Sequence, residues 1–455
     1  MLLLALHYAF RVTGLHYDSE QYWQLATFEK LSTVRSARGY FFPALLAPLH
    51  YLTSVSGNPL LTYRLGMSLF YGLLLTTLLP AAFSQAFGGK LSLQRRLVPV
   101  VLMAALFPGM LLYPLSDLPA LLLALAALMC VLRGQEVTTS RWVFIGLLFA
   151  AGALIGAAYN TRTIYLFAAI PLGLLAVVTV GGVRARVPFP RWLGLAAFVA
   201  GVVVISLPQA AINKHQRGVN SLAVQSDINN KSLFASQLAW GMTVQRYETT
   251  LYAEALSSQA LYFDPAGAKL FKEVMGGGDL FSLSYYLEVV ARRPLDFLAL
   301  YTRHVVNGLD VRDGLVYTHK PSSLRNRTAL FNFLVLALAV WVTLSIRARA
   351  PPTSGGFRPV PGSWAVSLVL LMLPVAAIVP GAIETRFFLP LHTLAYCVIA
   401  FHFDAQLLRR HFTLHGRILL LALMVAAGAY FAMTFSTMAN HRYDWPDLYR
   451  NGPPK

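Results

Sequence analysis

Two carboxylates two residues apart, surrounded by aromatic side chains, are the residues of this chain best suited to proton transfer. Asp18 and Glu20 stand in the run His16-Tyr-Asp-Ser-Glu-Gln-Tyr22-Trp, directly after the first apolar stretch. In such a pair one carboxylate can act as a general base, while the second orients it or binds a metal ion. The sequence therefore predicts a catalytic segment in the first loop of the chain.

The same segment has a structural alternative. Asp18 with Gln21 three residues later is a capping-box pattern, which would begin a helix over residues 19–30. Capping alone does not account for Glu20 or for the aromatic residues on either side. The pattern therefore favours the functional interpretation.

Other charged residues stand at the expected ends of apolar runs. Asp117, in Tyr113-Pro-Leu-Ser-Asp-Leu-Pro, is either the N-cap of the next helix or part of a site, and the sequence leaves both open. Arg162 and Arg386 could extend towards lipid headgroups, or they could hold a phosphate through paired hydrogen bonds. Glu384 lies beside Arg386 and favours the second interpretation there.

The elements that must position these residues are membrane helices. The chain is 56% hydrophobic and 12% charged, with a mean hydropathy of +0.57. Because a helix needs about 20 apolar residues to cross a hydrocarbon core of roughly 30 Å, we expect an all-α polytopic membrane protein. About eleven transmembrane helices are predicted, near residues 2–14, 60–88, 97–113, 118–132, 142–159, 163–182, 192–212, 329–346, 364–380, 387–403 and 418–437.

The distribution of charge predicts how these helices are oriented. When they alternate from a cytosolic N-terminus, the inner loops carry fourteen Lys and Arg residues against only Glu136 and Asp404. The other seventeen acidic residues then fall outside, as the positive-inside rule requires. This asymmetry and contact with membrane lipid explain most of the pI near 10.0, so no nucleic-acid partner is expected.

Three parts follow along the chain. Residues 1–212 form a seven-helix catalytic membrane module, and residues 329–455 form four more helices and an outer tail. Residues 213–328 form the one large aqueous segment, which is too aromatic to be disordered and is expected to be a helical cap. Its part 285–306 has apolar residues at helical spacing between basic ones, which predicts an amphipathic helix on the outer membrane surface.

The order of these motifs resembles the GT-C superfamily of polyprenyl-phosphate-sugar-dependent glycosyltransferases. The branch it resembles contains the protein O-mannosyltransferases and the lipid A aminoarabinose transferases. The resemblance covers the N-terminal module and the tenth helix well, and residues 213–328 hardly at all. Its landmarks are the short first helix, Asp18-Ser-Glu20, Arg38-Gly-Tyr-Phe-Phe-Pro43, Tyr113 to Pro119, Arg162, and Glu384-Thr-Arg386-Phe-Phe-Leu-Pro390.

The resemblance implies a role for each of these residues. Asp18 would be the catalytic base, with Glu20 and Asp117 supporting it or binding a divalent metal. Such a metal, Mg²⁺ or Mn²⁺, is not required by the resemblance, because members of the superfamily differ in their need for one. The donor phosphate would be held by Arg38, Arg162 and Arg386, with His16, Tyr22 and Glu384 in supporting positions.

The expected activity is sugar transfer from a polyprenyl-phosphate donor lipid to a glycan, glycolipid or protein acceptor, with inversion at the sugar. The expected location is the bacterial inner membrane, with the active site facing the periplasm. A flippase for lipid-linked substrates is one alternative, but it would need charged residues inside a central cavity. An O-antigen ligase or polymerase with a lipid-diphosphate donor is another, and it would rely on outer residues such as Arg303 and His304.

Overall fold

The computed structural model describes most of the chain, in two compact units. The described residues are 1–12, 14–31, 39–136, 140–180, 191–225, 227–228, 231–249, 259–275, 282–314, 317, 321–347, 363–403 and 414–444. The first unit comprises Met1–Ala104, Met110–Gln225 and Pro351–Pro374, and the second comprises Ala105–Gly109, Ser226–Ala350 and Val375–Lys455. The predicted parts 1–212, 213–328 and 329–455 are divisions by membrane side and stay predictions.

Helices dominate the described chain, and several are long and apolar enough to cross a membrane. Within the described residues six meet both conditions: Pro59–Phe87, Asp117–Gly134, Arg141–Thr161, Trp192–Arg217, Arg325–Ser345 and His415–Asn440. The prediction of a helical, multi-pass membrane protein is therefore confirmed at this level.

Five of the predicted membrane helices are shorter. They are α1 (Leu2–Phe10), α7 (Leu93–Leu106), α11 (Leu166–Val180), α18 (Ser363–Ile378) and α19 (Leu389–His402), which have 9 to 16 residues. At 1.5 Å per residue they extend about 14–24 Å, which is less than the roughly 30 Å of a hydrocarbon core. The count of eleven crossings thus stays a prediction.

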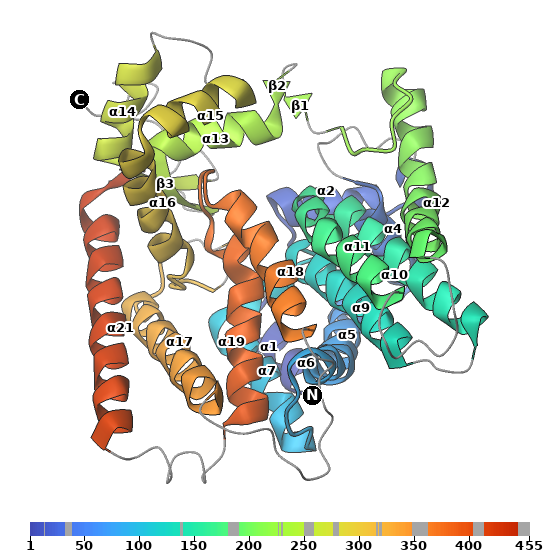
Figure 1. Ribbon diagram of the computed structural model, residues 1–455, viewed down its shortest axis with the longest axis horizontal. Coiled ribbons are helices and arrows are strands. Elements are labelled where there is room, and N and C mark those ends of the chain that lie inside the picture. Colours follow the sequence, from blue (N-terminus) through green and yellow to red (C-terminus); the bar gives the residue numbers. More distant parts are fainter. Residues whose placement is uncertain are drawn as a thin grey trace. The chain divides into compact units, whose positions relative to one another are not determined.

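The first unit is built around three long helices. In addition to α1, α7 and α11, it contains α2 (Tyr17–Leu25), α3 (Phe28–Leu31), α4 (Phe41–Val55), α5 (Pro59–Leu73), the π-helical turn Leu74–Leu78, α6 (Leu79–Phe87), most of α8 (Pro108–Leu112), α9 (Asp117–Glu136), α10 (Arg141–Thr161), the 3₁₀ turn Thr163–Tyr165 and α12 (Arg191–Arg217). Helix α10 packs against both α9 and α12 (Figure 1).

Glycines allow α10 and α12 to approach closely. A Cβ on Gly152 would lie 1.8 Å from the carbonyl oxygen of Phe198, and one on Gly201 would lie 2.1 Å from that of Phe149. Small residues at helix contacts let backbones come together, which is the packing mode favoured between membrane helices. This contact holds the C-terminal end of α10, which carries Arg162, in a fixed position against α12.

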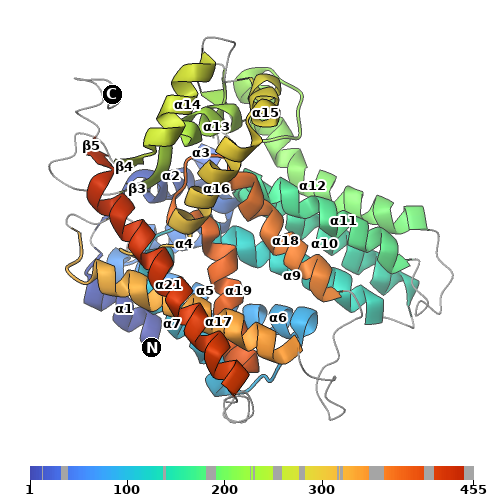
Figure 2. The ribbon, with the colours of Figure 1, turned by 60° about the vertical axis from the view of Figure 1, so that its left-hand side comes forward.

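The second unit contains a small sheet as well as helices. Its elements are β1 (Asp227–Ile228), β2 (Lys231–Ser232), α13 (Leu233–Thr243), β3 (Val244–Thr249), β4 (Gln259–Phe263), α14 (Pro265–Met275), α15 (Leu283–Arg292), α16 (Pro294–Gly308), α17 (Arg325–Arg347), the 3₁₀ turn Thr385–Phe388, α19, α21 (Leu414–Asn440) and β5 (Arg442–Asp444). The three-stranded antiparallel sheet has the order β3-β4-β5 (Figure 2).

Two expectations for the outer segment need correction. The segment is not purely helical, because β3 and β4 form a sheet within it. The helix predicted over 285–306 is two helices, α15 and α16, with Arg293 between them in a non-helical conformation (φ −129°, ψ 52°). Pro294 causes this break, since proline restricts the residue before it and begins a helix more readily than it continues one.

Pairing of β4 with β5 fixes one aspect of the topology. Tyr262 lies opposite Arg442, and the Phe263 amide donates to the His441 carbonyl oxygen at 2.9 Å. Strands joined by hydrogen bonds lie on the same side of a membrane. The end of α21 and the segment that contains β4 therefore share one side, as the predicted topology requires.

Candidate active site

The first carboxylate segment is a short helix whose N-cap is His16, with Ser19 at the N3 position bonded back to it. The Ser19 hydroxyl accepts from the His16 amide at 3.1 Å and donates to the His16 carbonyl oxygen at 2.7 Å. Tyr17, the first residue of α2, has a φ of +48°, a conformation that is uncommon outside glycine. The helix thus starts before Asp18, and the capping-box alternative, with Asp18 as the cap, is wrong. It also ends at Leu25, short of the predicted residue 30.

The two carboxylates of this helix differ in environment. Asp18 is half-buried, whereas Glu20 is exposed and accepts a hydrogen bond from the Gln24 side chain at 2.9 Å. Both lie in the first turn of α2, where the helix dipole favours negative charge. A half-buried carboxylate can be reached by a substrate and still be partly shielded from water.

A hydrogen bond from Tyr22 connects α2 to the segment before α9. Its hydroxyl donates to the Ser116 hydroxyl at 3.0 Å inside the protein, and its ring packs edge-on against Phe42 with centroids 4.9 Å apart. Ser116 is the residue next to Asp117. The helix that carries Asp18 and Glu20 is therefore held against the start of α9, although 94 residues separate Tyr22 from Ser116.

Asp117 forms a buried ion pair with Arg162. The Arg162 Nη1 atom lies 2.6 Å from Asp117 Oδ1, and the Asp117 side chain is only 4% exposed. The Ser116 carbonyl oxygen accepts the first hydrogen bond of α9, from Ala120, so Ser116 occupies the N-cap position. The cap interpretation of Asp117 is therefore wrong, and its carboxylate instead neutralises an arginine at the end of α10.

Buried tyrosines lie around this ion pair. Tyr71 of α5 and Tyr165 of the following 3₁₀ turn are both within electrostatic range of the Asp117 carboxylate. Both side chains are almost fully buried. The ion pair consequently lies in a polar, aromatic environment at the ends of several helices.

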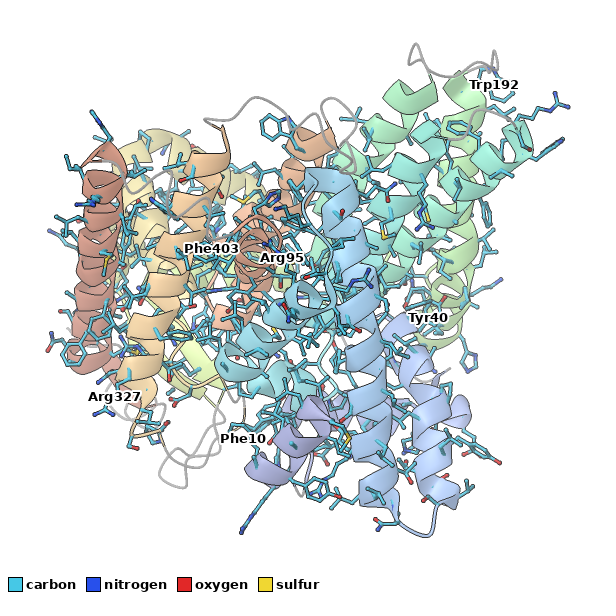
Figure 3. The ribbon with its side chains drawn as sticks, turned by 90° about the horizontal axis from the view of Figure 1, so that it is seen from below. Phe10, Tyr40, Arg95, Trp192, Arg327 and Phe403 are labelled. Carbon is cyan, nitrogen blue, oxygen red and sulfur yellow. The ribbon has the colours of Figure 1, made fainter. Side chains whose placement is uncertain are left out.

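The predicted phosphate ligand Arg38 lies outside the described residues, but the residues after it are well placed. Gly39 touches the backbone of Asn160, and Tyr40 donates its amide to Gln209 Oε1 at 3.1 Å and its hydroxyl to the Ile205 carbonyl oxygen at 2.7 Å. Tyr40 is labelled in Figure 3, where α4 begins. These contacts bring the start of α4 to the end of α10, two residues before Arg162.

The remaining predicted pair, Glu384 and Arg386, belongs to the second unit. Arg386 Nε lies 2.6 Å from Glu384 Oε2, and Thr249 at the end of β3 donates to Glu384 Oε1 at 2.9 Å. The Tyr247 amide donates to the Ile383 carbonyl oxygen at 2.8 Å, which joins this segment to β3. The first unit holds the other predicted site residues Asp18, Glu20, Asp117 and Arg162.

The second unit also contains a buried charge cluster that the sequence did not reveal. Arg246 Nη1 lies 2.9 Å from Asp310 Oδ2, and Arg246 Nη2 lies 2.7 Å from Glu248 Oε1. Two further arginines complete the cluster, with Arg312 Nε 2.6 Å from Asp310 Oδ2 and Arg325 Nη2 3.0 Å from Glu248 Oε2. No local sequence motif predicts this cluster, because its residues come from β3, the loop after α16 and the start of α17. The closely spaced charges at residues 310–313 were the only signal.

Electrostatics in this cluster favour the ionised carboxylate. Burial raises the pKa of Glu248, but attraction from Arg246 and Arg325 outweighs burial and lowers the pKa to about 2. Buried charges are tolerated when each is paired and hydrogen-bonded. The cluster therefore joins β3, the loop after α16 and α17 as a structural centre of the second unit.

Arg303 and His304, the residues of the lipid-diphosphate alternative, are engaged within the same unit. Arg303 Nε lies 2.5 Å from the buried carboxylate of Asp264. His304 is fully buried, its Nδ1 lies 2.6 Å from the Val379 carbonyl oxygen, and burial lowers its pKa. A buried histidine and a paired arginine are poorly disposed to receive a diphosphate.

The three predicted metal ligands do not form a common site. In the part of the chain that the structure describes, no group of three His, Cys, Asp or Glu side chains could hold a metal ion. Asp18, Glu20 and Asp117 are all described. Shared coordination of one metal by these three carboxylates therefore does not fit their arrangement.

The sequence matches no known protein-family model and no curated protein.

Proposed function

We propose that this chain is an integral-membrane glycosyltransferase of the GT-C type. It transfers a sugar from a polyprenyl-phosphate donor to a hydroxyl group of a glycan, glycolipid or protein. The reaction takes place on the periplasmic side of a bacterial inner membrane. The observation that supports this proposal best is the Tyr22–Ser116 hydrogen bond, because it holds the half-buried Asp18 helix beside the Asp117–Arg162 ion pair.

In this proposal Asp18 is the general base. Asp18 is half-buried in the first turn of α2, where an acceptor hydroxyl can reach it, whereas Glu20 is exposed to water and Asp117 is only 4% exposed. Asp18 would remove the proton of the acceptor hydroxyl as the hydroxyl oxygen attacks the anomeric carbon. Such general-base catalysis typically contributes about 10²–10⁴-fold to the rate.

The leaving group is the polyprenyl phosphate. Its bond to the anomeric carbon breaks as the acceptor bond forms, so the configuration at the sugar inverts and the bonding electrons pass to the phosphate oxygen. Negative charge grows on that oxygen in the transition state, and a guanidinium group beside it stabilises this charge. The proton held by Asp18 is afterwards released to water.

The test is a transfer assay with the purified protein in lipid nanodiscs. Radiolabelled sugars linked to a polyprenyl monophosphate are incubated with the protein and a membrane extract that supplies acceptors. We expect label to pass from the donor to an acceptor of higher mass. Absence of both transfer and hydrolysis with every monophosphate donor would contradict the proposal.

Two outcomes of related assays would support the alternatives. Transfer from a polyprenyl-diphosphate donor alone would indicate a ligase or polymerase. Movement of the donor lipid between the leaflets of a liposome, without cleavage, would indicate a flippase.

A further inference from the structure

Arg64 in α5 is a half-buried arginine with an unusual set of partners. Its Nη2 donates to the Val12 carbonyl oxygen at 3.3 Å, and its guanidinium lies over the Tyr8 ring at 4.9 Å from the centroid. Its Nε atom is buried without a hydrogen-bond partner, and no carboxylate of the described residues pairs with it. A carbonyl dipole and a ring face therefore surround a positive charge that they do not neutralise.

This environment separates Arg64 from the arginines that the sequence suggested as phosphate ligands. Arg162 and Arg386 each lie 2.6 Å from a carboxylate that is largely buried. An anion would have to compete with that carboxylate for each of them. An anion that binds Arg64 would not have to displace a carboxylate. The planar guanidinium group also suits the oxygens of a phosphate.

His7 of α1 provides an independent indication at the same place. Its side chain is 1% exposed, and neither ring nitrogen has a hydrogen-bond partner in the described part of the chain. It packs edge-on against Tyr63, the neighbour of Arg64, with centroids 6.0 Å apart, and it lies within electrostatic range of Arg64. Leaving a buried polar group without a partner is unfavourable, and a ligand that accepts a hydrogen bond from His7 would relieve the cost.

Contacts between neighbouring residues connect Arg64 and His7 to α2, the helix that carries Asp18. Helix α1 packs against α5, and Val12, whose carbonyl oxygen Arg64 binds, belongs to the segment that connects α1 to α2. Trp23 of α2 also packs edge-on against Tyr63 at 5.2 Å. Phe10 in Figure 3 marks the end of α1, from which this connection starts.

We propose that Arg64 and His7 form an anion-binding subsite that holds the phosphate group of the lipid-linked donor. The inference rests on the proposed function, and it assigns donor binding to residues that no motif in the sequence indicated. Arg64 contributes the positive charge, and the imidazole of His7 donates one N–H. A phospholipid headgroup has the same phosphate chemistry, so the test must separate the two sources.

The test measures binding of a sugar-free polyprenyl monophosphate to the detergent-purified protein, through its effect on the unfolding temperature. We expect Arg64→Gln to weaken this binding about tenfold or more, because a charge-assisted hydrogen bond is lost. Arg64→Lys keeps the charge without the planar guanidinium group, and an intermediate loss is expected. Arg141→Gln is the matched control, since Arg141 also stacks on an aromatic ring, that of Trp142 at 5.2 Å, and should leave binding unchanged.

His7→Phe distinguishes a binding role from a structural one. It removes the unpartnered ring nitrogens but keeps an aromatic ring against Tyr63. We expect the free protein to be at least as stable as the wild type, whereas polyprenyl-phosphate binding weakens. Because this variant is expected to fold, it keeps the inference testable if Arg64→Gln does not. A less stable His7→Phe protein that binds the lipid normally would overturn the role of His7.

Competition experiments identify the source of the phosphate. Inorganic phosphate should displace the polyprenyl lipid at high concentration. Vesicles of phosphatidylglycerol should displace it no better than vesicles of phosphatidylcholine, and specific displacement by phosphatidylglycerol would overturn the donor assignment.

Failure of this inference and failure of the proposed function give different results. Unchanged donor binding in the Arg64 variants of an enzyme that still transfers sugar would overturn the subsite alone. Arg64-dependent binding of the polyprenyl phosphate without any transfer would support the subsite and contradict the glycosyltransferase proposal.

Discussion

At the scale of single residues, pairing decides which charged groups remain available for chemistry. Asp117 and Glu384 each hold an arginine at 2.6 Å, and Glu248 is held by Arg246 and Arg325. A carboxylate beside a guanidinium is stabilised in its ionised form and is correspondingly a weaker base. Asp18 is half-buried in the first turn of α2, and the proposed function assigns it the role of general base.

Asp18→Asn tests this assignment directly. Transfer should fall by about 10²-fold or more, because the general base is lost. Folding should change little, since Asp18 is not the N-cap of α2 and asparagine keeps its size. Removing a negative charge from the first turn of a helix typically costs about 0.3–1 kcal/mol. Turnover and thermal unfolding are measured on the same preparation, with Glu20→Gln as the control. A variant with near-normal turnover would remove Asp18 from the mechanism.

The Glu248 cluster makes the stability of the second unit depend on acid. The pKa of Glu248 is about 2 in the folded protein against 4.5 for the free group, so folding favours the ionised form. This stabilisation is complete above about pH 4.5 and is lost as the pH falls towards 2. Asp313, whose pKa burial raises, acts in the opposite direction.

Glu248→Gln should therefore flatten the acid limb of the stability profile. We expect a lower unfolding temperature than the wild type near neutral pH, because Arg246 and Arg325 lose a buried partner. The difference between the two proteins should shrink as the pH is lowered towards 3. Glu20→Gln, at an exposed position, should follow the wild type at every pH. A constant difference across the range would show that ionisation of Glu248 is not the cause.

At the scale of elements, the sequence predicted those helices that are encoded by a long run of consecutive apolar residues. Each predicted apolar run contains a helix, because many consecutive apolar residues specify one regardless of the rest of the chain. The sheet was missed because β4 pairs with β5, more than 170 residues further along, and short strands give little periodicity. The start of α2 was misassigned because its N-cap is His16, a residue not typical of that position, whereas Asp18 two residues later is typical of it. The Asp117–Arg162 pair and the contacts of Arg64 were likewise not predicted, because the partners are distant in sequence.

Gly39→Ala tests the contact between the start of α4 and the end of α10. A Cβ at residue 39 would lie 1.9 Å from the Asn160 carbonyl oxygen and 2.6 Å from its carbon, so one backbone must move. Overpacking of this kind typically costs about 1–3 kcal/mol, and here it would also displace the end of α10 next to Arg162. We expect a lower unfolding temperature together with reduced transfer.

Gly57→Ala is the control for this substitution. A Cβ at residue 57 would meet nothing within 4 Å, so the variant should be as stable as the wild type or slightly more stable. Equal behaviour of the two alanine variants would show that the close approach at Gly39 is not required.

At the scale of the whole molecule, the charge asymmetry and the β4–β5 pairing constrain the topology independently. The first predicts which side each loop occupies from the distribution of Lys and Arg. The second requires the end of α21 to share a side with the segment between α12 and α17, whatever the orientation of the chain. The positive-inside rule and the β4–β5 hydrogen bonds therefore both place these two segments on one side of the membrane, and this shared placement can be tested.

Single-cysteine labelling provides that test. In a chain whose Cys130 and Cys397 are replaced by serine, Leu287→Cys in α15 and Asn440→Cys at the end of α21 occupy exposed positions. Both should react with a membrane-impermeant maleimide in intact spheroplasts. The concentration of Lys and Arg in the opposite loops predicts that those loops are cytosolic and that these two segments are periplasmic. Leu91→Cys, in the exposed loop between α6 and α7, should react only after permeabilisation. Reaction of residues 287 and 440 from opposite sides would contradict the sheet. Reaction of both only after permeabilisation would keep the sheet but invert the topology and, with it, the side on which the proposed transfer takes place.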